Sequence, residues 1–163
     1  MVGSVLFGED EAVAQFVLSL IPGADIGQAY DANNNRMFCA LGVVRRGELV
    51  AGVIYHNCMM RRLTGQPYNI EVTMAATSAD WAMPQTMRTL FYYPFGDLGV
   101  ERMTARVARS NKRCRKLTKG LGFKEEGILE KAFDLGEKLD DLVIYGMRRS
   151  ACKWLPRPAA GVT

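Results

Sequence analysis

The sequence has too few metal-binding side chains, too widely scattered, to form a metal centre. Its one histidine is His56, and its four cysteines stand at positions 39, 58, 114 and 152 without a CxxC pair. A structural zinc site needs about four such ligands at characteristic spacings. The sequence therefore predicts no metal ion. The scattered cysteines are typical of free thiols in a reducing compartment, which favours a cytoplasmic protein.

Long apolar runs are also missing. No run approaches the roughly 20 residues that a membrane-spanning helix needs. The N-terminal MVGSVLFGED lacks a basic segment and is acidic at Glu9 and Asp10, unlike a secretory signal peptide. Hydrophobic residues make up 48% and charged residues 23% of the 163 residues, as in an ordinary globular domain. We therefore expect one domain over residues 1–155, a C-terminal tail over 156–163 and no membrane partner.

Positive charge is concentrated in one short segment. From Arg109 to Lys119, six of eleven residues are Lys or Arg and none is acidic, so the net charge of +4 depends on this segment. Proteins that coat nucleic acid usually spread their charge along a face or groove. A compact basic patch suits a small phosphorylated ligand at least as well, so specific nucleic-acid binding is not expected. The alternative is a solvated helix face without a ligand.

The hydrophobic pattern predicts an α/β chain with a mixed sheet, in the order β-α-β-β-β-α-β-α-β-β. Strands are expected within 1–7, in both arms of a hairpin over 38–57, and over 68–76, 101–109, 127–133 and 140–149. Helices are expected within 9–21, 79–99 and 111–121, and a loop over 24–35. Glycine, proline and asparagine mark the intervening turns, for example at Arg46-Gly47.

Local signals refine two of these helices. Ser110 is the expected N-cap of the basic helix, and Gly122 is its expected C-cap. In the helix within 79–99, Pro84 suits the first turn, and an apolar stripe begins at Met83. The strand 68–76 alternates, with one apolar face and one polar face. The polar face contains Asn69, Glu71 and Thr73.

Residues 111–127 read NKRCRKLTKGLGFKEEG, and this run resembles a motif of the GNAT family of acyl-CoA-dependent N-acetyltransferases. The branch that includes ribosomal-protein N-terminal acetyltransferases has Asn-x-x-Ser followed by Leu-Gly-Phe-x-x-Glu-Gly, leading from a helix into a strand. Cys114 replaces the serine here. The resemblance covers roughly residues 37–149. Small chains of this kind also resemble GNAT proteins met in phage and prophage genomes.

The resemblance implies a mixed, mostly antiparallel sheet with helices on both faces and a splayed pair of fourth and fifth strands. Acetyl-CoA, as co-substrate, would lie in the gap between these two strands. Its pantetheine arm would pair with the backbone of the fourth strand near Thr73, Met74 and Ala75. Asn111 would contact that arm, and Arg113 and its basic neighbours would attract the phosphates.

The family's pyrophosphate loop aligns with residues 78–83, which implies cofactor contacts from Ala79, Trp81, Ala82 and Met83. The usual glycines and the leading base of that loop are missing here. Glycine matters in such loops because the backbone must come close to the phosphates and direct its amides at them. Trp81 is bulky, and the alternative for this residue is packing against the core at a helix start.

Amine acetylation needs a group that accepts a proton from the attacking amine. Glu71 is the first candidate, acting directly or through water, because it lies on the polar face beside the expected thioester. The alternative is an exposed strand carboxylate. His56 is the second candidate base, with a structural histidine as its alternative. Many family members place a tyrosine acid where this chain has Thr118, although the ribosomal branch often lacks it.

Two functions remain open at this stage. The first is an N-acetyltransferase that moves an acetyl group from acetyl-CoA to a primary amine by direct attack in a ternary complex. The acceptor would be a protein N-terminus, a lysine or a small amine, and the protein a monomer or homodimer. The second is a catalytically inactive GNAT-fold module that binds a protein or nucleic acid. The altered loop over 78–83 favours the second, and the intact run over 111–127 favours the first.

Overall fold

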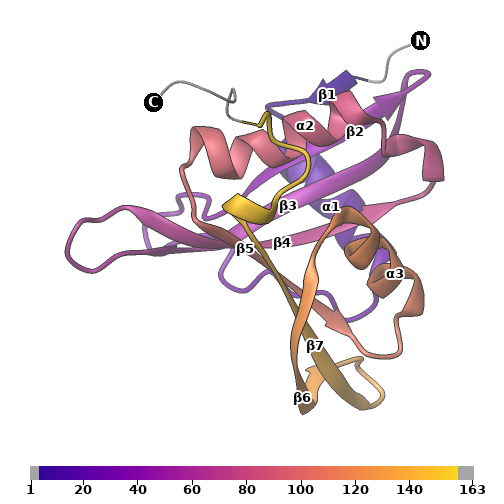
Figure 1. Ribbon diagram of the computed structural model, residues 1–163. Helices are drawn as coiled ribbons and strands as arrows, with labels where there is room; N and C mark the ends of the chain where they lie inside the picture. The colour runs from indigo at the N-terminus through magenta and orange to yellow at the C-terminus, as the bar shows by residue number, and fades with distance from the viewer. Residues whose placement is uncertain (1–3, 158–163) are drawn as a thin grey trace.

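The computed structural model describes residues 4–157, and its elements follow the order that the sequence predicts (Figure 1). Residues 1–3 and 158–163, with most of the expected tail, lie outside the described part. The strands are β1 (Ser4–Leu6), β2 (Cys39–Arg45), β3 (Glu48–Met60), β4 (Pro67–Ala76), β5 (Arg102–Ala108), β6 (Lys124–Asp134) and β7 (Leu139–Arg148). The α-helices are α1 (Asp10–Leu20), α2 (Pro84–Tyr92) and α3 (Lys112–Leu121). Short helical turns are Ala79–Trp81, Tyr93–Asp97 and Arg149–Ala151.

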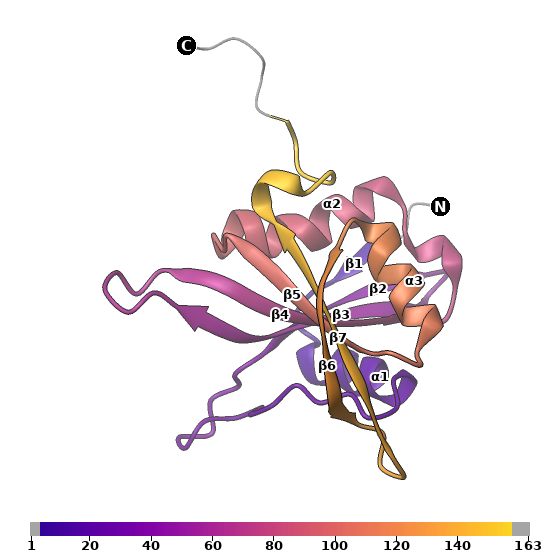
Figure 2. The same cartoon turned by 60° about the horizontal axis from the view of Figure 1, so that its bottom comes forward.

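The strands form one sheet in the order β1-β2-β3-β4-β5-β7-β6. Every neighbouring pair is antiparallel except β4 and β5, which are parallel. Helix α1 covers one face of the sheet, and α2 and α3 cover the other (Figure 2). The expected mixed, mostly antiparallel sheet with helices on both faces is thus confirmed. No helix within residues 4–157 has the length and apolar character needed to cross a membrane.

The parallel pair β4–β5 is joined over a short distance only. Its register runs from Asn69 opposite Arg102 to Val72 opposite Ala105, and no further pair follows, although β4 continues to Ala76. The two strands therefore diverge at their C-terminal ends, as expected. Among the described residues, no strand lies beside this edge of β4 beyond Val72.

Helix α3 begins one residue later than the sequence suggests. Ser110 is not its N-cap, because the Ser110 hydroxyl and amide both donate to Asp140 Oδ2, at 2.6 and 2.9 Å. Asn111 is the N-cap instead, and its Oδ1 accepts from the amide of Cys114 at 3.1 Å. At the other end, Gly122 has φ of 110° and caps the helix, as predicted.

Helix α2 begins with Pro84 in its first turn, as predicted. Met83 is the N-cap residue and is 36% exposed, so it is not part of the buried stripe that the sequence suggests. Buried residues of α2 pack with those of α3 and the central strands in the larger of two hydrophobic clusters. The smaller cluster lies between α1 and the opposite face of the sheet.

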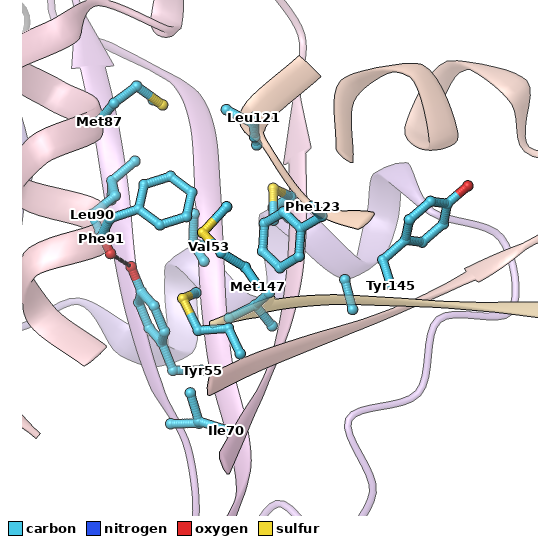
Figure 3. Packing of buried hydrophobic residues seen from close by; sticks show 14 of the residues in the cluster. Val53, Tyr55, Ile70, Met87, Leu90, Phe91, Leu121, Phe123, Tyr145 and Met147 are labelled. Atoms are coloured by element: carbon cyan, nitrogen blue, oxygen red, sulfur yellow. Dashed lines mark hydrogen bonds between the residues drawn. The ribbon is translucent and has the colours of Figure 1, made fainter. Parts of the chain in front are cut away.

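A buried hydrogen bond fixes the end of α2 to the sheet. In a continuous α-helix the residue at 94 would donate its amide to the Leu90 carbonyl, but Pro94 has no N–H. The hydroxyl of Tyr55, on β3, donates to this carbonyl at 2.6 Å (Figure 3). Burial raises the pKa of Tyr55 well above its ordinary value, so the hydroxyl stays a donor.

Replacing Tyr55 with Phe should lower the free energy of unfolding by about 1–2 kcal/mol, since the Leu90 carbonyl loses this donor while the ring remains. Urea denaturation followed by circular dichroism measures the change. Tyr92→Phe is the matched control, because Tyr92 is 51% exposed and should change stability little. Equal effects of the two substitutions would contradict a role for the buried bond.

Candidate active site

A cavity of about 530 Å³ opens where β4 and β5 diverge. Its wall includes residues of α3, on one face of the sheet, and of the loop after α1, on the other face. The cavity therefore passes through the sheet at the divergence. The strands contribute Glu71, Val72, Thr73 and Met74 from β4 and residues 105–108 from β5.

The polar face of β4 meets His56 of β3 inside this cavity. His56 is directly opposite Glu71 in the antiparallel register, so their side chains lie on the same face. The Nδ1 atom of His56 is 3.9 Å from Glu71 Oε2, too far for a hydrogen bond. Glu71 Oε1 accepts from Asn57 Nδ2 at 3.0 Å, which orients the carboxylate. The two candidate bases are thus brought together, with Oε2 of Glu71 nearest to the imidazole.

The two ring nitrogens of His56 differ in their surroundings. Its Nε2 lies 2.9 Å from the hydroxyl of Thr73, whereas buried Nδ1 makes no hydrogen bond. When Nε2 donates to Thr73, Nδ1 carries the lone pair, but this atom has almost no surface open to the cavity. Burial lowers the pKa of His56, and the Glu71 carboxylate partly offsets this effect. The side chain is only 4% exposed, so the neutral imidazole is favoured near pH 7.

The loop after α1 closes the cavity on this side of the sheet. Gly23 has φ of +72°, and a Cβ there would lie 2.3 Å from the main-chain oxygen of Asp134 on β6. The loop and β6 therefore meet backbone to backbone, and only glycine allows the approach. Asp25 lies in the same loop, where its Oδ1 accepts from the Gly27 amide at 2.7 Å. Both Asp25 and Asp134 line the cavity.

Arg106 of β5 also lines the cavity, on the same face of the sheet as Glu71. The sequence interpretation above did not single out Arg106, Asn57 or Asp25. For Arg106 a signal was present, because Arg102, Thr104 and Arg106 alternate along β5 and mark a polar face. Within residues 4–157, no group of three or more His, Cys, Asp and Glu side chains is arranged to hold a metal ion.

Three residues were expected to pair with pantetheine, and they occupy the free part of β4. Thr73 and Met74 line the cavity, and Ala75 follows them, buried against α1. Their backbone lies beyond the last β4–β5 pair, so it faces the divergence rather than a strand. Arg113 of α3 reaches this end of β4, where its Nη2 donates to the Ala76 carbonyl at 3.1 Å.

The basic helix divides its charges between two directions. Arg115 points away from the end of β4: its Nε donates to the hydroxyl of Tyr145 at 3.2 Å, and Nη1 donates to the Arg109 carbonyl. Lys119 lies 3.7 Å from Glu125. Arg113 is thus the positively charged residue that lies beside the open edge of β4. Asn111 lines the cavity, and since its oxygen caps the helix, its Nδ2 is the group that can still donate.

Residues 79–83 lie at the start of α2 without lining the cavity. Trp81 is 3% exposed and packs in the main core, which is the alternative that the sequence left open for it. Ala79, Ala82 and Met83 are exposed. The carboxylate of Asp80 accepts from the Ser78 hydroxyl, which lowers the pKa of Asp80. Contacts of this segment with a cofactor stay a prediction.

Solved structures with the same fold are GNAT acetyltransferases. The ribosomal-protein-S5-alanine acetyltransferase from Vibrio fischeri is 14% identical with a TM-score of 0.65, over 94% of this chain and 96% of that chain. RimJ of Mycobacterium smegmatis, solved with CoA-disulfide, is 13% identical with a TM-score of 0.64, over 91% of this chain and 82% of that chain. A chimera of the spermidine N-acetyltransferase SpeG from Vibrio cholerae and hSSAT is 13% identical with a TM-score of 0.66, over 91% and 96%.

No family model matches the sequence, and no curated protein matches it. The chain nevertheless has the GNAT acetyltransferase fold, including the divergent β4–β5 pair. Identities this low establish the fold alone. The reaction and its acceptor are therefore argued from the residues of the cavity.

His56 should titrate below 6.5, the ordinary value for its side chain, because burial disfavours the imidazolium. As the chain has a single histidine, its imidazole signals can be followed by NMR without being distinguished from those of another histidine. Glu71→Gln should lower the pKa further, since it removes a charge that favours imidazolium. The free energy of unfolding should also fall as pH drops through 6.5, because the unfolded chain takes up the proton first. A pKa at or above 6.5 would contradict this environment.

Proposed function

We propose that the protein is an N-acetyltransferase that moves an acetyl group from acetyl-CoA to a primary amine. The observation that carries this proposal is the cavity through the sheet at the β4–β5 divergence, with Glu71 and His56 in its wall. A thioester arm entering from the α3 side and an amine entering from the other side would meet beside these two residues. Holding both reactants in that geometry would itself accelerate the reaction.

The open edge of β4 is suited to an extended, amide-containing arm. Residues 73–76 of β4 have no strand neighbour on the β5 side, so their main-chain groups can pair with pantetheine amides as an added strand would. The phosphates would then lie toward the end of β4. The N-terminus of α2 offers amides that favour anions, and Arg113 adds a positive charge there.

Of the two candidate bases, Glu71 is the one that an amine in the cavity can reach. The His56 Nδ1 atom lies 3.9 Å from Glu71 Oε2 but is buried, with almost no accessible surface. A primary amine that donates one hydrogen to Glu71 Oε2 keeps its lone pair for the thioester. This contact would orient the amine for attack.

Glu71 is proposed as the general base. The nitrogen lone pair forms a bond to the acetyl carbon, the carbon–sulfur bond breaks, and the proton lost by nitrogen passes to Glu71 Oε2. The CoA thiolate departs and takes a proton from solvent. His56, next to Glu71, is the second candidate for the proton. No covalent intermediate with the protein is needed.

The inactive binding module remains the second candidate function, because the segment over 79–83 is unlike a phosphate loop. Trp81 is in the core, and Asp80 places a carboxylate near the start of α2. A negative charge there would oppose pyrophosphate binding. Direct measurement of cofactor affinity separates the two functions.

Acetyl-CoA should bind the wild-type protein, more weakly as salt rises, in isothermal titration calorimetry. Replacing Lys112 and Arg113 together with Ala should raise the dissociation constant roughly tenfold or more, since each exposed charge contributes up to about 1 kcal/mol. Lys124→Ala, an exposed lysine of β6 outside the cavity, is the control and should bind as the wild type does. Absence of binding by the wild type would favour the inactive module.

Glu71→Gln should lower turnover by about two to four orders of magnitude if the carboxylate accepts the proton. The amide keeps an oxygen for Asn57, and affinity for acetyl-CoA should change little. Thiol release from acetyl-CoA measures the rate, and Glu130→Gln on exposed β6 is the matched control. A rate within about threefold of the wild type would remove Glu71 from the proton transfer and leave His56, to be tested by His56→Gln.

A further inference from the structure

Arg106 is an uncommitted positive charge in the wall of the cavity. It is exposed, and it makes no hydrogen bond or ion pair with the other residues of the range 4–157. Its neighbour on the same face, Arg102, is held by Asn69 at 3.1 Å and by an ion pair with Glu126. The structure of the sheet thus explains Arg102, whereas the Arg106 side chain has no such partner in the described part of the chain.

The position of Arg106 relative to Glu71 follows from the β4–β5 register. Glu71 is opposite Thr104, and Arg106 follows two residues later on the same face, about 7 Å farther along the strand. There it lies beyond the last β4–β5 pair. Its positive charge adds to burial in lowering the pKa of His56. Arg106 and the proposed site for the amine therefore border the same space.

The remaining charges around this space are acidic. Asp25, Glu71 and Asp134 line the cavity together with the single cation Arg106, counted over the described part of the chain. These carboxylates favour an ammonium group before it loses its proton. They would repel any anion on the acceptor except beside Arg106, and a doubly charged phosphate more than a carboxylate. A long polyamine would meet Arg106 as a like charge.

We propose that the acceptor carries a carboxylate close to its reacting amine, and that Arg106 binds this carboxylate. The inference rests on the proposed function and names its acceptor class. A guanidinium presents two parallel N–H groups to a carboxylate, which fixes the orientation as well as the affinity. With the amine at Glu71 Oε2, a carboxylate a few bonds away could reach Arg106 in the same cavity. A primary amine with a carboxylate a few bonds away is found in a free α-amino acid and in a peptide that begins with Asp or Glu.

Two matched acceptor pairs test the proposal and separate its two sources. The peptide pair is Asp-Ala-Ala amide and Asn-Ala-Ala amide, and the amino-acid pair is alanine and alaninamide. We would measure kcat/KM at equal concentrations of neutral amine, and affinity by calorimetry in the presence of CoA. The charged member of at least one pair should be preferred about tenfold or more, as a charge-assisted hydrogen bond implies. The pair that shows the preference identifies the source.

Arg106→Gln should reduce that preference to within about twofold while leaving the affinity for acetyl-CoA unchanged. Because the Arg106 side chain is exposed and has no hydrogen bond or ion pair within residues 4–157, the variant should fold normally. Arg62→Gln is the control, since Arg62 is exposed in the β3–β4 hairpin and does not line the cavity. It should keep the wild-type preference.

Two results would overturn the inference. The first is equal rates and affinities within both pairs for the wild type. The second is a preference that survives in Arg106→Gln. If that variant also loses affinity for acetyl-CoA, Arg106 is a cofactor contact instead. If no acceptor is acetylated but the charged member binds more tightly through Arg106, the proposed function fails, and what stands is the binding of a carboxylate by Arg106.

Discussion

The cavity of this protein depends on the point at which the pairing between β4 and β5 ends. At the closed end, Thr104 Oγ1 donates to Asn69 Oδ1 at 2.7 Å, and Arg102 joins the same oxygen, so side chains as well as main chain connect the strands. Beyond Val72 this connection ends, and Cys114 and Thr118 of α3 line the gap instead. The cavity, the free edge of β4 and the approach to Glu71 all exist because the pairing stops there.

The divergence also separates two electrostatic environments. On the α3 side, the end of β4 faces Arg113 and the basic helix. On the other side, the cavity wall is mainly acidic around Glu71. A polyanionic cofactor and a cationic amine would be attracted to opposite faces of the sheet, so the charge pattern favours one direction of assembly. The basic side at α3 and the acidic side around Glu71 partly cancel, so strong local charge is compatible with a net charge of only +4.

Periodicity and turn chemistry predicted the order of the elements, the turn at Arg46-Gly47 and the polar face that contains Glu71, because these are local properties. The meeting of His56 with Glu71 depends on the β3–β4 register, which the sequence does not specify. Likewise, Ser110 does not cap α3 because its hydroxyl donates a hydrogen bond to Asp140, 30 residues later in the chain. Which cation of the basic run faces β4 depends on the rotation of α3. Long-range pairing thus decided what local patterns left open.

The backbone contact at Gly23 has a consequence for how this site can change. There the wall of the cavity is main chain meeting main chain, so side-chain substitutions elsewhere alter the width of this part of the wall little. New acceptors would then be accommodated by exchanging the charged groups that project from that frame. The backbone would keep the width of this part of the cavity constant, and acceptor specificity would change mainly through the charged side chains that line it.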